Sequence, residues 1–181
     1  MKNLNFLSKA LCLITMLVIC STAAEAASGG DGTELRVAVA HGHLNDIISR
    51  MDRGDFKVVG VWEKDDRMRR DNGLIRHDST IPAFADLGEM LDTTRPEAVV
   101  AYGPIYDHME VVEACAPRGI HVMVEKPLAV NNRHARRMAK LARRHGILLL
   151  TNYETSWYSS NHEAYRMVKD GIIGDITRIL V

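Results

Sequence analysis

The chain has 181 residues, of which 46% are hydrophobic and 25% are charged, values that are typical of a globular protein with one sizeable core. Its 23 basic and 23 acidic residues balance, so the sequence produces no global field that would attract nucleic acid or an anionic membrane surface. A small molecule is the kind of partner that this composition favours.

The first 26 residues have the pattern of a signal peptide. Lys2 and Lys9 precede an apolar run over residues 10–20, and small residues follow it. The run is too short for a stable membrane-spanning helix, which needs about 20 residues. Ala24-Glu25-Ala26 offers a cleavage site after Ala26. The sequence therefore predicts export through the general secretory route to the periplasm or beyond, with no stable membrane span.

A membrane anchor and lipidation at Cys20 are the alternatives to a cleaved signal. Cleavage would leave Cys115 as the one cysteine of the mature chain, which excludes an internal disulfide. Cys115 lies in an apolar helical pattern, so it is predicted to be a buried small hydrophobe.

After a flexible polar leader over residues 27–34, short β-branched runs alternate with longer helical patterns. This alternation predicts an α/β fold with a doubly wound parallel sheet. The runs are apolar enough for strands that are buried on both faces. The predicted strands cover Leu35–Ala40, Phe56–Trp62, Ala98–Ala101, 121–124 and 147–151. The predicted helices cover Asn45–Asp52, 87–91, 106–116 and Asn132–His145.

The last of these helices has defined ends and a strongly basic face. Asn131 or Asn132 can cap its N-terminus, and Gly146 can end it. No aromatic residues are interleaved with its cations, so a solvated face is favoured over a groove for nucleic acid. The cations are Arg133, Arg136, Arg137, Lys140, Arg143 and Arg144.

The turn after the first predicted strand carries part of a dinucleotide-binding fingerprint. It reads AHGHLN from Ala40 to Asn45 and keeps only the middle glycine of G-x-G-x-x-G, Gly42, where the backbone approaches a pyrophosphate. Ala40 and Asn45 replace the outer glycines, and the bulk of Asn45 lowers the expected affinity for NAD. His41 and His43 are predicted to line this turn, because two histidines with no third ligand nearby form a weak metal site.

A carboxylate follows the second predicted strand at the spacing of a ribose-binding acid. Glu63 lies 21 residues beyond Gly42, close to the separation of about 20 residues at which such an acid accepts hydrogen bonds from the adenosine ribose. A carboxylate repels a 2′-phosphate, so Glu63 favours NAD over NADP, although Lys64 and Arg67 could soften that preference. The alternative is an ordinary surface acid at a strand end.

Three segments make the sequence resemble the Gfo/Idh/MocA family of oxidoreductases. The most specific is the strand that ends in Glu125-Lys126-Pro127, a signature of the family. The second is the strand that ends before Gly103 and Pro104 and is followed by His108. The third is the glycine-rich segment over residues 169–175, which is similar to the helix end that leads into the family's substrate domain.

The resemblance implies a NAD(P)-binding Rossmann domain over residues 35–151 and the start of a truncated α+β substrate domain over residues 152–181. It also implies that Lys126 contacts substrate and nicotinamide and assists proton movement, with Glu125 on the cofactor side. A lysine suits this role because its head is a compact donor and its pKa shifts readily on burial. Gly103, Pro104 and His108 are then expected to lie near the cofactor.

Aromatic and acidic residues follow the last predicted strand of the Rossmann domain, where the family often has an arginine-containing stretch that faces the substrate. Glu154, Trp157 and Tyr158 suit stacking on, and hydrogen bonding to, a sugar-like ligand. Packing between domains would explain the two aromatic residues equally well. The β-prone end of the chain, residues 176–181, is predicted to be a strand that invites association with a second copy.

The resemblance thus implies hydride transfer between NAD and a carbinol carbon of a sugar or polyol. NAD-dependent glycoside cleavage is an alternative within the same family. A nucleotide-binding module without turnover, or an inactive fragment, is the alternative from a different class of protein, favoured by the incomplete glycine fingerprint.

Overall fold

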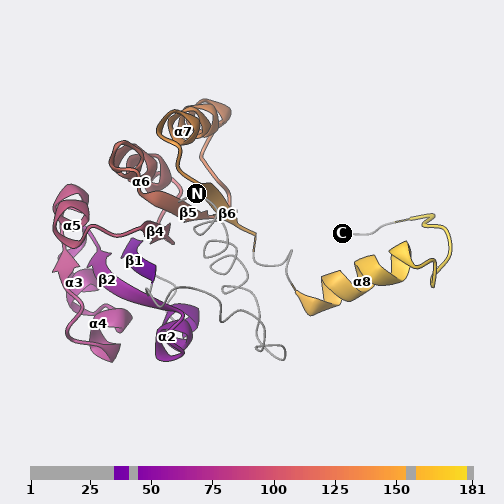
Figure 1. Ribbon diagram of the computed structural model, residues 1–181, viewed down its shortest axis with the longest axis horizontal. Coiled ribbons are helices and arrows are strands. Elements are labelled where there is room, and N and C mark those ends of the chain that lie inside the picture. The colour runs from indigo at the N-terminus through magenta and orange to yellow at the C-terminus, as the bar shows by residue number, and fades with distance from the viewer. Residues whose placement is uncertain (1–34, 41–44, 154–157, 179–181) are drawn as a thin grey trace. The chain divides into compact units, whose positions relative to one another are not determined.

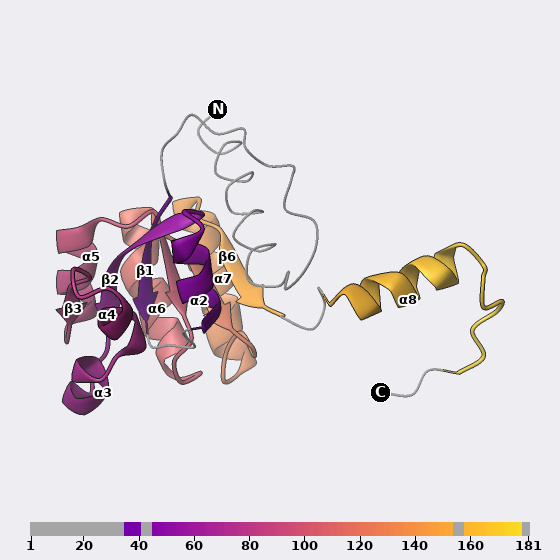
Figure 2. The same ribbon diagram turned by 90° about the horizontal axis from the view of Figure 1, so that it is seen from below.

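The computed structural model describes residues 35–40, 45–153 and 158–178. They belong to two compact units, of which one is Asp31–Asn152 and the other includes Tyr153–Val181. The larger unit contains a sheet with helices on both faces, and the smaller one contains a single described helix (Figures 1 and 2).

Six parallel strands form the sheet of the larger unit, in the order β3-β2-β1-β4-β5-β6. The order reverses between β1 and β4, and this reversal is the switch point at which open α/β sheets bind ligands. The predicted doubly wound fold is therefore confirmed. The strands are β1 Leu35–Ala40, β2 Phe56–Trp62, β3 Ala83–Phe84, β4 Ala98–Ala101, β5 His121–Glu125 and β6 Leu149–Asn152.

Helices cover both faces of this sheet. In Figure 1, α5, α6 and α7 lie in a row along one face and α2 lies on the other, as right-handed crossovers between parallel strands require. Because both faces are covered, the central strands are apolar throughout, and all four residues of β4 are buried. The helices of this unit are α2 Asn45–Asp52, α3 Asp66–Arg70, α4 Gly73–His77, α5 Leu87–Thr94, α6 Asp107–Cys115, the 3-10 turn η1 Ala116–Arg118 and α7 Asn132–His145.

Capping residues determine where the helices begin and end. Asn131 accepts a hydrogen bond from the backbone N–H of His134 at 2.9 Å, so Asn131 rather than Asn132 caps α7, and Gly146 ends it with a φ of 67°. Asp86 caps α5 in the same way. α5 runs to Thr94, further than the predicted range of 87–91, because its polar last turn still packs onto the sheet.

Three short elements were not among the predicted ones. α3 and α4 have five residues each and begin at the caps Asp65 and Asn72, while β3 has two residues. Helices of one turn carry too little hydrophobic periodicity to be found from sequence. The caps were the signal that could have located them.

β6 begins two residues later than predicted. Ile147 donates its backbone N–H to the carbonyl of Ala142 at 3.1 Å and so completes the end of α7. The next N–H, that of Leu148, is accepted by Nδ1 of His121 at 2.9 Å. The strand therefore starts at Leu149 and extends to Asn152.

The hydrophobic core lies between the sheet and the row formed by α5, α6 and α7. Its fully buried members include Trp62, Met90, Val112 and Met138. Cys115 is also fully buried, as predicted, and burial raises the pKa of its thiol to about 12. The thiol therefore stays protonated at physiological pH and packs as a small hydrophobe.

The smaller unit contains α8, Ser159–Lys169, in which no side chain is buried. Gly171 and Gly174 follow it with φ values of 72° and 70°, so the helix-ending turn expected over residues 169–175 is present. The predicted strand over 176–181 is wrong for residues 176–178, which form no strand. A strand needs a partner, and the described residues of this unit offer none. Residues 179–181 lie outside the described part.

Across the described ranges, no helix is both long and apolar enough to cross a membrane. The predicted signal peptide and leader, residues 1–34, lie outside those ranges.

The bond between His121 and Leu148 predicts a pH-dependent stability. Burial lowers the pKa of His121, and its Nδ1 can accept the Leu148 N–H only when that nitrogen is unprotonated. The folded protein therefore binds this proton more weakly than the unfolded chain. The stabilisation is complete above the ordinary pKa of about 6.5 and is lost as the pH falls below it.

We expect this effect to be under about 1 kcal/mol, because His121 is partly exposed to solvent. Urea unfolding between pH 7.5 and pH 5 should show a smaller loss of stability in His121→Asn, whose side-chain oxygen can accept the same N–H without titrating. Parallel curves for the two proteins would show that this histidine does not set the pH dependence.

Candidate cofactor site

The carboxyl ends of β1 and β4 meet at the switch point of the sheet. Ala40 and Ala101 are paired in register there, and both are buried. The backbone N–H of Tyr102 donates to the carbonyl of Ala40 at 2.9 Å, which continues the pairing beyond the strands. Small side chains at both strand ends leave room for a ligand close to the backbone.

Glu63 lies directly after β2 at the same edge and is only 4% exposed. The backbone N–H of Asp65 donates to its Oε1 at 3.0 Å. Its own backbone is held on both sides, because its N–H donates to Phe84 of β3 at 3.0 Å and its carbonyl accepts from Arg69 at 2.9 Å. The predicted ribose-binding acid is therefore fixed in place at the end of β2.

Lys64 does not act as the free cation that the sequence suggested beside Glu63. Its Nζ donates to Asp107 at 3.2 Å and to Glu110 at 2.6 Å, and it lies 4.9 Å from the centroid of the Trp62 ring. The hydrogen bond to Glu110 is the main cause that raises the pKa of Lys64. This lysine connects the end of β2 to α6 and is already compensated by two carboxylates.

Lys126 follows β5 directly, with an exposed side chain. Its backbone is held, because the Lys126 N–H donates to Oε1 of Glu125 at 3.0 Å. The peptide bond between Lys126 and Pro127 is cis.

Asn152 holds the other oxygen of Glu125. Its Nδ2 donates to Oε2 of that carboxylate at 2.9 Å, across the register pair that joins the last residues of β5 and β6. Asn152 is 9% exposed. Asn152 was not among the predicted site residues, although a polar side chain at the end of an apolar strand was an available signal. The two strand ends together fix the backbone that carries Lys126.

Replacing Asn152 with alanine should therefore loosen the Glu125-Lys126 turn. We expect a loss of about 1–2 kcal/mol in the free energy of unfolding, because a hydrogen bond to a carboxylate disappears from a buried position. NAD affinity should fall several-fold in calorimetric titration. The control is Asn132→Ala, an exposed asparagine in the first turn of α7. Equal behaviour of the two variants would remove Asn152 from the site.

His108 lies in the first turn of α6 and is 1% exposed. Its Nδ1 lies 3.2 Å from the carbonyl oxygen of Leu128, two residues after Lys126. A carbonyl can only accept, so Nδ1 carries the hydrogen. The other ring nitrogen, Nε2, is buried and has no hydrogen-bond partner in the described part of the chain. A ligand with an N–H or O–H donor could satisfy it.

The remaining predicted residues are placed as follows. Gly103 is half-buried and Pro104 exposed in the loop between β4 and α6, where the Asp107 N–H donates to the Pro104 carbonyl at 2.8 Å. Asn45 is the first residue of α2. Tyr158 belongs to the smaller unit and is 43% exposed. His41, Gly42, His43, Glu154 and Trp157 lie outside the described residues.

No group of three histidine, cysteine, aspartate or glutamate side chains in the described ranges could hold a metal ion. The chemistry of the edge fits a dinucleotide instead. A fixed acid follows β2, a buried nitrogen of His108 has no hydrogen-bond partner among the described residues, and an exposed lysine follows β5. All three lie where an α/β sheet binds its ligand.

Comparison with known proteins agrees with this geometry. Residues 37–153 match the model of an oxidoreductase family described as having a NAD-binding Rossmann fold, GFO_IDH_MocA. Among relatives, the D-glucoside 3-dehydrogenase of Escherichia coli is 27% identical over 68% of this chain and 35% of its own length. The dTDP-3,4-didehydro-2,6-dideoxy-alpha-D-glucose 3-reductase of Streptomyces antibioticus is 32% identical over 48% of this chain and 26% of its own.

Solved structures share the fold. The myo-inositol 2-dehydrogenase of Lactobacillus plantarum superposes with a TM-score of 0.66 at 22% identity, over 80% of this chain and 43% of that one. The chain therefore spans less than half the length of the proteins it matches. The family match covers well over half of the chain itself, and the protein thus belongs to the Gfo/Idh/MocA oxidoreductases through their NAD-binding Rossmann domain.

Proposed function

We propose that this protein takes part in NAD-dependent hydride transfer at a carbinol carbon of a sugar or polyol. The observation that carries the proposal is the turn after β5, where Glu125 is held from both sides and Lys126 follows it at the ligand-binding edge. The names of the relatives support the substrate class, because they act on a glucoside, a nucleotide-linked sugar and an inositol.

Each group at the edge has a distinct role in this proposal. Glu63 accepts hydrogen bonds from the adenosine ribose, and the backbone around Gly42 binds the pyrophosphate. Lys126 takes up the proton of the hydroxyl group on the reacting carbon. NAD, when bound, would supply the hydride acceptor.

We infer a preference for NAD over NADP from two features of the β2 end. Glu63 would repel a 2′-phosphate, and Lys64 is already paired with Asp107 and Glu110. The family alone does not decide this point, because one relative is the scyllo-inositol 2-dehydrogenase (NADP(+)) IolU of Bacillus subtilis. Calorimetric titration with both dinucleotides measures the preference directly.

The proposed activity is tested by following NADH formation with inositols, glucose and glucosides. In a protein in which a complete substrate domain follows this chain, we expect reduction of NAD with at least one of them. In that protein Lys126→Ala should bind NAD within about twofold of wild type while losing turnover, the pattern of a group used in the transition state. Lys169→Ala, at the end of α8, is the control. Undiminished turnover in Lys126→Ala would remove the lysine from the reaction.

A nucleotide-binding module without turnover is the second candidate. It is favoured by the exposure of Lys126 and by Asn45, which stands at the start of α2 in place of the third glycine. NAD binding with no NADH formation across the whole panel would select this candidate.

We also propose that the protein is exported. The support is the pattern of Lys2 and Lys9, the apolar run over residues 10–20 and the small residues before Ala27. N-terminal sequencing of the secreted product should begin at Ala27. Association with a second copy through the C-terminal residues has weaker support, namely the exposure of Ile172, Ile173 and Ile176, and light scattering tests it.

A further inference from the structure

A groove of about 540 Å³ lies on the surface where α6 and α7 pack together. Its volume is in the range of small-molecule sites. Apart from Met109 of α6, every residue that lines it comes from one face of α7. The lining residues are Met109, Arg133, His134, Arg136, Arg137 and Lys140.

The positive charge of this groove is only partly compensated among the described residues. α7 has six arginines and lysines, all exposed, and no carboxylate. Arg137 pairs with Glu113 of α6, whereas the other five cations have no ion-pair partner within the described ranges. Glu110, the next acid along α6, is engaged by Lys64.

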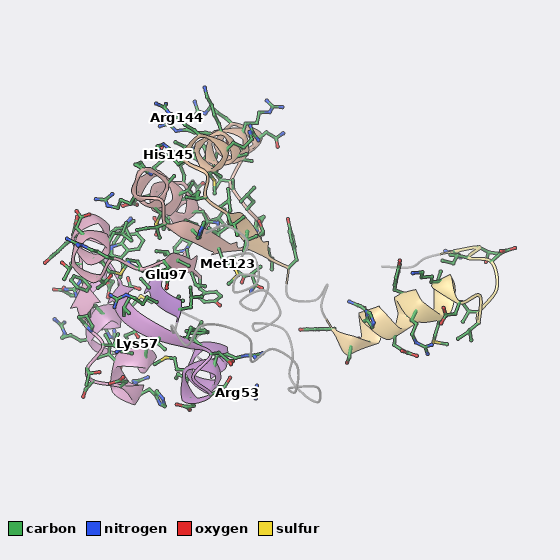
Figure 3. All side chains as sticks on the ribbon, viewed as in Figure 1. Arg53, Lys57, Glu97, Met123, Arg144 and His145 are labelled. Carbon is green, nitrogen blue, oxygen red and sulfur yellow. The ribbon has the colours of Figure 1, made fainter. Side chains whose placement is uncertain are left out.

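The position of the cations along α7 also indicates a ligand. Arg143 and Arg144 lie in the last turn, where the helix dipole favours positive charge. Figure 3 shows the side chains of this helix and labels Arg144. Arg133 and Arg136 lie in the first half of α7, where the helix dipole disfavours positive charge and the neighbouring cations repel them. Both of them line the groove, together with Arg137 and, one turn further along, Lys140.

We propose that this groove binds a saccharide that carries carboxylate or sulfate groups, an inference that rests on the proposed sugar chemistry of the protein. Arginine forks bind such groups with paired hydrogen bonds. The groove begins at Met109 and Arg133, near the N-terminal ends of α6 and α7. Both helices begin after strands that end at the candidate site, so this end of the groove lies on the side of the candidate site.

Two other polyanions fit the groove less well. α7 presents no phenylalanine, tyrosine or tryptophan for stacking on nucleobases. A bilayer is a broad surface, whereas these cations surround a concavity, and α7 has no exposed large apolar residue to insert. Nucleic acid and anionic lipid are therefore included in the test as competing ligands and are not part of the proposal.

The test is calorimetric titration of the 181-residue chain with a heparin-derived tetrasaccharide, tetragalacturonate and neutral maltotetraose. We expect binding of at least one acidic tetrasaccharide and none of maltotetraose. Arg133→Gln with Lys140→Gln should weaken that binding by at least about tenfold. The matched control is Arg143→Gln with Arg144→Gln, which removes the same charge from the same helix outside the groove, and should change affinity by less than about twofold.

Three outcomes would overturn the proposal: equal loss in both double variants, equal binding of maltotetraose, or tighter binding of a DNA duplex or of vesicles with 30% anionic phospholipid. Thermal melting verifies that the variants fold, and glutamine at exposed helix positions is a mild change. NAD is titrated in parallel. Absence of saccharide binding beside intact NAD binding contradicts this inference alone, whereas absence of NAD binding contradicts the proposed function.

Discussion

Replacing Glu63 with alanine should weaken NAD binding by about 1.5–3 kcal/mol, or roughly tenfold to more than a hundredfold in Kd, because the ribose loses a charge-assisted acceptor. The carboxylate is well placed for this role. It is 4% exposed and held at the end of β2 by the Asp65 N–H and the pairing with Phe84. Calorimetric titration of wild type and variant measures the difference.

Two further variants separate charge from shape. Glu63→Gln keeps the size and one acceptor oxygen, so it should lose less affinity than Glu63→Ala. Glu97→Ala is the matched control, because Glu97 also accepts a backbone N–H, that of Arg36 at 3.0 Å, but lies before β4 at the opposite edge of the sheet. NAD affinity in Glu97→Ala should equal that of wild type.

The affinity for NADP tests the same carboxylate from the opposite side, because Glu63 is expected to repel the 2′-phosphate. Because Lys64 stays paired with Asp107 and Glu110, Glu63→Ala should gain little affinity for NADP. An unchanged Kd for NAD in Glu63→Ala would show that Glu63 does not bind the ribose and is an ordinary acid at a strand end.

The strands and long helices could be predicted from sequence because each carries a strong periodic or apolar signal. β1, β2 and β4 occur at the predicted residues, since a strand covered on both faces must be apolar throughout. The start of β6 could not be predicted, because Ile147 looks like a strand residue but completes the end of α7 through its bond to Ala142. Such a bond depends on tertiary packing.

The positions of three candidate residues could be predicted because a motif marks each of them. Glu63, Lys126 and His108 lie at the ends of their elements on the carboxyl edge of the sheet. Asn152 and the engagement of Lys64 were not predictable, because both depend on which strand and helix become neighbours. The register of β5 and β6 brings Asn152 to Glu125, and the packing of α6 near β2 brings two carboxylates to Lys64.

Gly60 is the position in β2 at which added volume should be most damaging. A Cβ there would lie 3.0 Å from Cγ2 of Thr94 and 3.3 Å from side-chain atoms of Met90 and Phe84. α5 and β3 can approach β2 closely only because this side chain is absent. Gly60→Val should therefore lower the free energy of unfolding by about 1–3 kcal/mol through overpacking, measured by urea denaturation.

Thr94→Ser provides the test of this mechanism, because it removes the Cγ2 methyl group while keeping the hydroxyl that donates to the Met90 carbonyl at 2.7 Å. In the Gly60→Val background the serine should restore part of the lost stability, whereas in wild type it should cost a little through the lost methyl group. The coupling between the two changes is the direct measure of the contact. Strictly additive effects would mean that the valine is accommodated elsewhere. Since Gly60 lies on β2 three residues before Glu63, which directly follows the strand, a displaced β2 should also weaken NAD binding, and Thr94→Ser should recover that loss in parallel.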